Sequence, residues 1–166
     1  MPFPENLHAA IWRSSEGPGV SVPPTAIFLL AFAGAYLLHL VWPSAGPWSS
    51  PVAWWMGAAL LGGGAALFVW ALWTFASERT GIMLQRAASH IVRKGPYRWS
   101  RNPMYVSFVA LYLGAALVAG AGWPLLLMPL PVLGTQKWVI AREERYLRSM
   151  FPIEYGAYCR AVRRWL

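Results

Sequence analysis

Four long apolar runs, separated by turn-forming or basic segments, organise this chain. They cover residues 24–42, 52–76, 103–118 and 123–140 and are nearly free of charged side chains. Pro24 and Pro103 open two of the runs, at a position where proline is favoured in a helix. A bilayer core needs about 20 apolar helical residues. We therefore expect an all-α, polytopic membrane protein with about four transmembrane helices.

The connections between the runs are short and uncharged in two places. Residues 43–51 are rich in Pro, Ser and Gly, and tryptophans surround them like an aromatic belt at a membrane surface. Residues 120–122 form a tight turn, so the last two runs should make a hairpin whose far ends, Pro103 and Arg142, lie close together. Pro129 and Pro131 predict a kink in the second arm of this hairpin.

Two features inside the first two runs have structural interpretations. Three consecutive glycines, residues 62–64, allow close approach of another helix. His39 is the ionisable residue of the first run, and we expect it near the membrane surface, within reach of lipid headgroups.

Composition agrees with a membrane protein. Apolar residues make up 57% of the 166 residues and charged residues only 12%, whereas soluble proteins have about 25% charged residues. The single cysteine, Cys159, excludes an intramolecular disulfide framework.

The net charge of +8 has an uneven distribution. Six of the 14 basic residues lie in residues 77–102, seven lie from Lys137 onwards, and the two short connections have none. The positive-inside rule then predicts a multi-pass membrane protein with both termini and the basic loop in the cytoplasm. Basic residues beside apolar runs indicate contact with an anionic lipid surface and argue against nucleic acid as a partner.

By length the chain is a single domain, residues 1–166. Its predicted parts are a lead-in (1–23), two spans (24–76), a cytoplasmic loop (77–102), a helical hairpin (103–141) and a cytoplasmic tail (142–166).

Two polar clusters should meet at the cytoplasmic surface. Arg101, Asn102 and Tyr105 end the basic loop, and Glu143 and Glu144 end the last span. Carboxylates suit an amino group, arginines suit a carboxylate or phosphate, and aromatic faces suit a sulfonium. The sequence has no dinucleotide-binding glycine motif, no metal-ligand spacing of His and Cys, and no Ser-His-acid set that indicates catalysis.

Simpler interpretations exist for both clusters. Glu143 and Glu144 fit a solvated helix end, with Glu144 pairing with Arg148 one turn on. Asn102 fits a helix N-cap before Pro103, and such a helix start also suits an anionic group.

Two motifs in the second half of the chain are GPYRWSRNPMY at 95–105 and REERYL at 142–147, the latter followed by Phe151, Glu154, Tyr155 and Tyr158. Together they resemble the superfamily of isoprenylcysteine carboxyl methyltransferases and phospholipid N-methyltransferases. The resemblance implies an integral membrane enzyme that uses S-adenosylmethionine in a pocket formed by the loop and the tail, with S-adenosylhomocysteine as product. A lipophilic acceptor would enter from the bilayer.

The resemblance also implies roles for individual residues. Glu143, Glu144 and Arg101 would be catalytic. The cofactor contacts carried over from the motifs would be Gln85, Ser89, His90, Ile91, Val92, Tyr97, Asn102, Pro103, Met104 and Tyr105. No metal is implied.

This sequence departs from the superfamily pattern at three positions. Ser89 takes the place of a frequent histidine, with His90 following it; Asn102 replaces the histidine of the prenylcysteine branch, and Val139 replaces an arginine of that branch. The acceptor is therefore expected to be a phospholipid amine, an isoprenoid or sterol-like lipid, or a small lipophilic thiol or acid, rather than a prenylcysteine carboxylate. A sterol-reductase-like enzyme using NADPH and a non-enzymatic membrane subunit are the alternatives.

Overall fold

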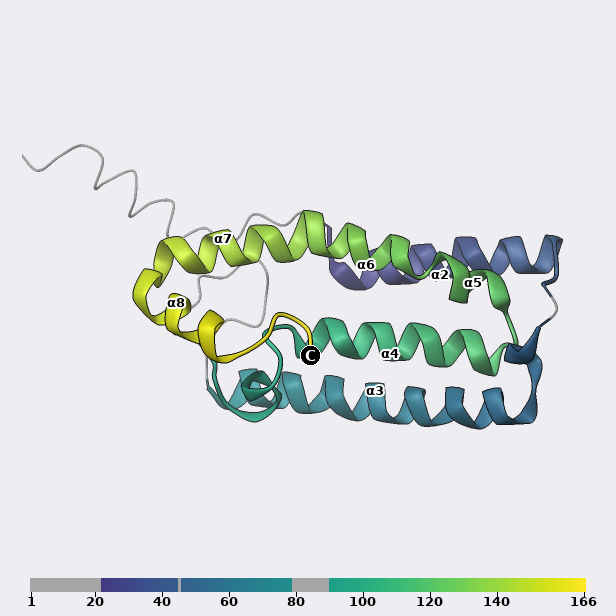
Figure 1. Ribbon diagram of the computed structural model, residues 1–166, viewed down its shortest axis with the longest axis horizontal. Helices are drawn as coiled ribbons and strands as arrows, with labels where there is room; N and C mark the ends of the chain where they lie inside the picture. Colours follow the sequence, from purple (N-terminus) through teal and green to yellow (C-terminus); the bar gives the residue numbers. More distant parts are fainter. Residues whose placement is uncertain (1–21, 45, 79–89) are drawn as a thin grey trace, which may run out of the picture.

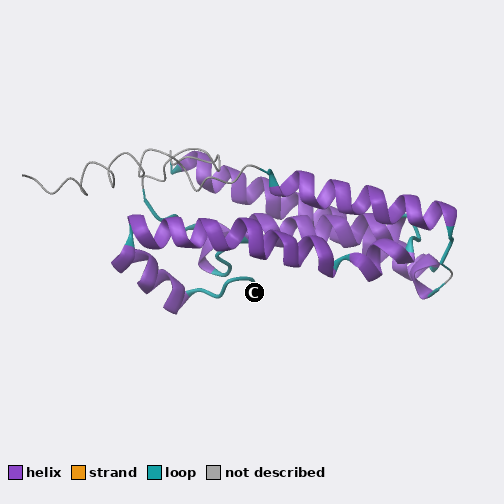
Figure 2. Cartoon of the chain, turned by 90° about the horizontal axis from the view of Figure 1, so that it is seen from above, coloured by secondary structure: helices purple, strands orange, loops and turns teal. Residues whose placement is uncertain are grey.

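The computed structural model describes residues 22–44, 46–78 and 90–166, and within these ranges the chain is almost entirely helical. The helices form an elongated bundle with the connections at its two ends (Figures 1 and 2). The predicted all-α class is thus confirmed for the described residues. Gln85 and Ser89 lie outside them.

The first two helices follow the predicted runs within one or two residues. Helix α2 covers Pro24–Val41 and helix α3 covers Pro51–Ser77, with the short turn η1 (Pro47–Ser49) between them. Ser50 caps α3 by accepting a hydrogen bond from the Ala53 amide at 3.2 Å, and Pro51 takes the first helical position. Among the described residues, α2 and α3 are long and apolar enough to cross a membrane.

The second half of the chain begins with the short turn η2 (Gly95–Arg98) and helix α4 (Pro103–Val118). The chain then reverses at Gly120, whose φ of +61° favours glycine. The return arm is broken, as the prolines predict, into α5 (Gly122–Leu127), α6 (Pro129–Thr135) and the π-helical segment η3 (Gln136–Ile140). It continues directly into α7 (Ala141–Met150), and α8 (Pro152–Ala161) folds back from its end (Figure 1).

Helices α3 and α4 pack most closely, through glycine. A Cβ atom on Gly57 would lie 2.8 Å from the Gly114 carbonyl oxygen, and one on Gly64 would lie 3.2 Å from the Leu111 amide nitrogen. Gly62 and Gly63 have open space beside them instead. The packing interpretation of the glycine triplet therefore holds for Gly64.

Aromatic side chains join α2 to α4. Phe28 and Phe32 approach the Tyr112 ring with centroids 6.3 and 5.2 Å apart, and Phe28 also contacts Phe108. At the far end of α2, His39 Nδ1 lies 3.3 Å from the Ser44 hydroxyl, so this histidine has a partner within the chain.

One end of the bundle gathers the polar elements. The end of α3, η2, the start of α4, and α7 with α8 lie together there, and the C-terminus returns to the same end (Figure 1). A small core of Tyr105, Val139 and Ile140, with Trp165 packed against it, joins α4 to the return arm.

Candidate functional site

The acidic pair at the start of α7 has two different environments. Glu144 is buried, with 7% of its side chain exposed, whereas Glu143 is partly buried on the neighbouring position of the same turn. Because residues one apart on a helix point in different directions, each carboxylate meets a different set of partners.

Glu143 is joined to Tyr105. The Tyr105 hydroxyl donates to the two carboxylate oxygens of Glu143, at 2.9 and 3.0 Å. Burial raises the pKa of Glu143 to about 7; repulsion from Glu144 acts in the same direction, and the hydrogen bond from Tyr105 opposes both. A carboxyl group with this pKa can exchange a proton near neutral pH.

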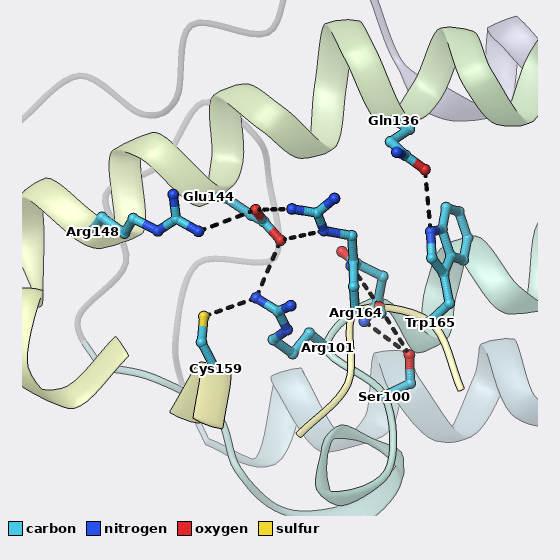
Figure 3. Close-up of polar contacts among 9 residues, drawn as sticks. Ser100, Arg101, Gln136, Glu144, Arg148, Cys159, Arg164 and Trp165 are labelled. Atoms are coloured by element: carbon cyan, nitrogen blue, oxygen red, sulfur yellow. Dashed lines mark hydrogen bonds and ion pairs between the residues drawn. The ribbon is translucent and has the colours of Figure 1, made fainter. Parts of the chain in front are cut away.

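Glu144 is surrounded by guanidinium groups (Figure 3). Arg164 donates to both carboxylate oxygens, at 2.9 and 2.8 Å, and Arg101 donates from Nη1 at 3.2 Å. Arg148, one turn along α7, lies at 3.6 Å. The expected pair of Glu144 with Arg148 is therefore present, but the interpretation of the acidic pair as a solvated helix end is wrong for Glu144.

Arg101 links the acidic pair to α8. Its Nη1 lies 2.8 Å from the sulfur of Cys159, and 12% of its side chain is exposed. Its Nε atom is buried without a hydrogen-bond partner among the described residues. A buried donor of this kind is available to an anionic group of a ligand.

Asn102 stands at the N-cap of α4 but does not cap it with its side chain, which corrects the sequence-based interpretation. Its side-chain amide instead donates to the Arg164 carbonyl at 2.9 Å. The Ser100 hydroxyl accepts from the Asn102 amide at 3.1 Å, so a neighbouring side chain fixes the start of the helix. Pro103 is buried at the first helical position, as expected.

The remaining predicted cofactor residues that the structure describes lie just before α4 or in its first turn. Val92 and Tyr97 are buried against Ala71 of α3, and Met104 packs on the same cluster. The Tyr97 carbonyl accepts from the Tyr158 hydroxyl at 2.7 Å, which ties η2 to α8, and burial raises the pKa of the Tyr97 hydroxyl above its usual range. Ile91 is partly buried, and His90 Nε2 lies 3.4 Å from Glu78 at the end of α3.

Sequence reasoning missed the last residues of the chain. Arg164 and Trp165 were counted only as part of a basic tail, yet Arg164 binds Glu144 and the Trp165 indole donates to Gln136 at 3.3 Å. Their basic and aromatic character was the available signal, but nothing in the local pattern indicates which residues they contact. Among the described residues, no group of three or more His, Cys, Asp or Glu could hold a metal ion.

Comparison with known proteins agrees with this arrangement. The family model described as "Phospholipid methyltransferase" matches residues 52–154, which run from α3 to α8 and include both motifs. An uncharacterized protein of Haemophilus influenzae is 40% identical over 63 residues, which are 38% of this chain and 100% of that protein. No solved structure matches. The family match and the two long apolar helices indicate a membrane methyltransferase, and the chain belongs to the phospholipid methyltransferase family.

Proposed function

We propose that this protein transfers a methyl group from S-adenosylmethionine to a lipophilic acceptor in the membrane, and that Glu143 removes the acceptor's proton. The observation that carries the proposal is the Glu143 carboxylate, with a pKa of about 7, beside Tyr105 at the polar end of an apolar bundle. Of the expected acceptors, a phospholipid amine fits best, because an ammonium group must lose a proton before it can act as a nucleophile.

The residues at this end of the bundle fit the amino-acid part of the cofactor. Such a group needs a cation for its carboxylate, and Arg101, which Glu144 holds at 3.2 Å, supplies it. The buried Nε of Arg101 adds a donor without a partner among the described residues. We assign cofactor binding to Arg101 and Glu144 together with Gln85, Ser89, His90, Ile91, Val92, Tyr97, Asn102, Pro103, Met104 and Tyr105.

The cofactor, when bound, supplies a methyl group on an electrophilic sulfonium. The protein orients the acceptor and limits the access of water, which are general sources of rate enhancement. Tyr97 and Tyr105 are buried and offer aromatic faces to a cation. Glu143 takes the proton from the acceptor while Tyr105 holds its carboxylate in place.

For the membrane arrangement we propose four spans: α2, α3, α4 and the broken arm from α5 to η3. Exposed tryptophans on α3 support it: Trp55 and Trp73, 69% and 73% exposed, mark its two ends. The 18 residues of α2 span about 27 Å, close to the roughly 30 Å of a bilayer core. In this proposal the hairpin 103–141 of the single domain lies in a bacterial inner membrane. The loop 77–102, the tail 142–166 and both termini lie in the cytoplasm.

Calorimetric titration of the purified protein tests this function against the two alternatives. We expect binding of S-adenosylhomocysteine, and loss of that binding in Arg101→Gln. Binding of NADPH instead would favour a reductase, and binding of neither would favour a non-enzymatic subunit. Arg98→Gln is the matched control, because Arg98 is an exposed neighbour in the same loop.

A further inference from the structure

The last five residues, 162–166, form a C-terminal strap across the polar end of the bundle (Figure 3). The Arg101 amide donates to the Arg163 carbonyl at 2.9 Å, and the Asn102 side chain donates to the Arg164 carbonyl at 2.9 Å. The Trp165 indole reaches Gln136 on the return arm. The strap therefore joins the loop before α4 to η3.

The guanidinium of Arg164 points from this strap to Glu144. It donates from Nε and Nη2 to the two carboxylate oxygens, which is the bidentate geometry that makes arginine pairs strong. Hydrogen bonding to Glu144 raises the pKa of Arg164, so this cation stays charged. The other groups that act on Glu144 or on its partners come from three elements: Arg101 before α4, Arg148 on α7, and Tyr155 and Cys159 on α8.

Glu143 faces a different set of groups. Its hydrogen-bond donor among the described residues is the neutral Tyr105 hydroxyl, and the other titratable groups that act on it are Tyr97 and Glu144. Two adjacent carboxylates thus have opposite environments, one with three cations and one with a phenol. Such a difference separates the proton affinities of paired acids.

We propose that Arg164 is a positioning residue whose bidentate pair holds the Glu144 carboxylate, so that the exchangeable proton of the acidic pair resides on Glu143. The strap adds the third cation and the only bidentate one that the described residues give to Glu144. Without it, Glu144 keeps Arg101 and Arg148 but loses its bidentate partner, and the acidic pair carries one positive charge fewer beside it. The consequence for turnover rests on the proposed function, whereas the proton's location does not.

Infrared spectroscopy of the full chain in lipid nanodiscs, stepped from pH 5 to pH 9, tests the location of the proton. We expect one protonated-carboxyl band that titrates near pH 7, disappears in Glu143→Gln and persists with a lower midpoint in Glu144→Gln, because repulsion from Glu144 raises the pKa of Glu143. In Arg164→Gln the midpoint should rise by about one pH unit, because a nearby opposite charge has been lost. A band that survives Glu143→Gln and disappears in Glu144→Gln would overturn the proposal.

Arg163→Gln is the matched control. It removes the same charge from the same strap, but Arg163 is exposed and contributes its carbonyl to the contacts described above. Equal midpoints in Arg163→Gln and Arg164→Gln would also contradict the proposal. If Arg164→Gln does not fold, Arg164→Lys keeps the charge without the bidentate geometry. A midpoint above that of wild type in this variant would support the proposal, and a wild-type midpoint would contradict it.

The same variants separate this inference from the proposed function. If the wild type transfers methyl groups, Arg164→Gln should lower kcat about fivefold at pH 7 and much less at pH 9, with the KM for the methyl donor changed less than about twofold. Absence of methyl transfer in the wild type would contradict the function and leave the infrared result to decide the location of the proton.

Discussion

The Tyr105 hydroxyl donates a hydrogen bond to the carboxylate of Glu143, 38 positions further along the chain. This contact joins the start of α4 to the start of α7, and therefore brings together the two sequence motifs that flank the hairpin. The two ends of the hairpin meet through side chains here, although the α4 and α6 backbones do not pack closely and α2 packs against both.

Replacing Tyr105 with Phe should shift the pH dependence of methyl transfer. The hydrogen bond lowers the pKa of Glu143, so its loss should raise that pKa above about 7. Hydrogen bonds to charged groups contribute about 1.5–3 kcal/mol, which corresponds to about one pH unit or more. We expect about a tenfold lower kcat at pH 7, with recovery near pH 9, in a measured pH–rate profile.

Tyr112→Phe is the matched control for this shift. Tyr112 lies on the same helix, and its buried hydroxyl has no hydrogen-bond partner among the described residues. An unchanged profile in Tyr112→Phe beside a shifted one in Tyr105→Phe is the expected result. Identical profiles in both variants would show that the Tyr105 contact does not tune Glu143.

Glu143→Gln should make the protein more stable at alkaline pH. The folded pKa of about 7 lies above the ordinary value of 4.5, so the folded state binds the extra proton and wild-type stability falls as pH rises from 4.5 to about 7. The glutamine variant lacks this titrating group and therefore this dependence. In chemical unfolding in detergent we expect the variant to gain up to about 2 kcal/mol over wild type between pH 5.5 and pH 8.5. Parallel stability curves would contradict the elevated pKa.

The helices were largely predictable from the sequence, because proline marks where they begin. Pro24, Pro51, Pro103 and Pro152 each stand at the start of a helix. The kink in the return arm followed from Pro129 and Pro131. These are local effects of a fixed φ angle and a missing N–H, so they appear in the sequence itself.

The detailed partners of the site were not predictable in the same way. Asparagine is a residue type favoured at N-caps, but the side-chain amide of Asn102 donates instead to the Arg164 carbonyl of the strap. Glu144 has an arginine one turn away, but its burial and its two further arginines come from segments 43 and 20 positions distant. Such contacts depend on how the tail folds back, and neither periodicity nor spacing encodes that path.

Gly114→Ala should destabilise the bundle. A Cβ there would lie 2.8 Å from the Gly57 carbonyl oxygen and 2.9 Å from the Leu61 amide nitrogen, so the α3 and α4 backbones must move apart. Overpacking of this kind costs about 1–3 kcal/mol, which should lower the midpoint of thermal unfolding. Gly63→Ala is the control: open space surrounds Gly63, and alanine favours a helix. Equal midpoints for the two variants would contradict the close packing.

Cysteine labelling in intact cells tests the proposed sidedness. In a Cys159→Ser background, cysteines replace the exposed residues Ser49, between α2 and α3, and Ser149, at the end of α7. A membrane-impermeant maleimide should modify Ser49→Cys in intact cells and Ser149→Cys only after permeabilisation. The reverse pattern, or equal labelling of both, would exclude the four-span arrangement with a cytoplasmic tail.

Methyl transfer by the purified protein in lipid vesicles tests the central claim most directly. With methyl-labelled S-adenosylmethionine and vesicles containing an amino phospholipid, we expect label in the lipid fraction with wild type. The rate should be at least about 100-fold lower with Glu143→Gln, since a positioned base contributes about 10²–10⁴-fold. Glu143→Gln should still bind S-adenosylhomocysteine as wild type does. Full transfer by Glu143→Gln would contradict the role of Glu143, and no transfer by wild type to any lipophilic acceptor would contradict the proposed function.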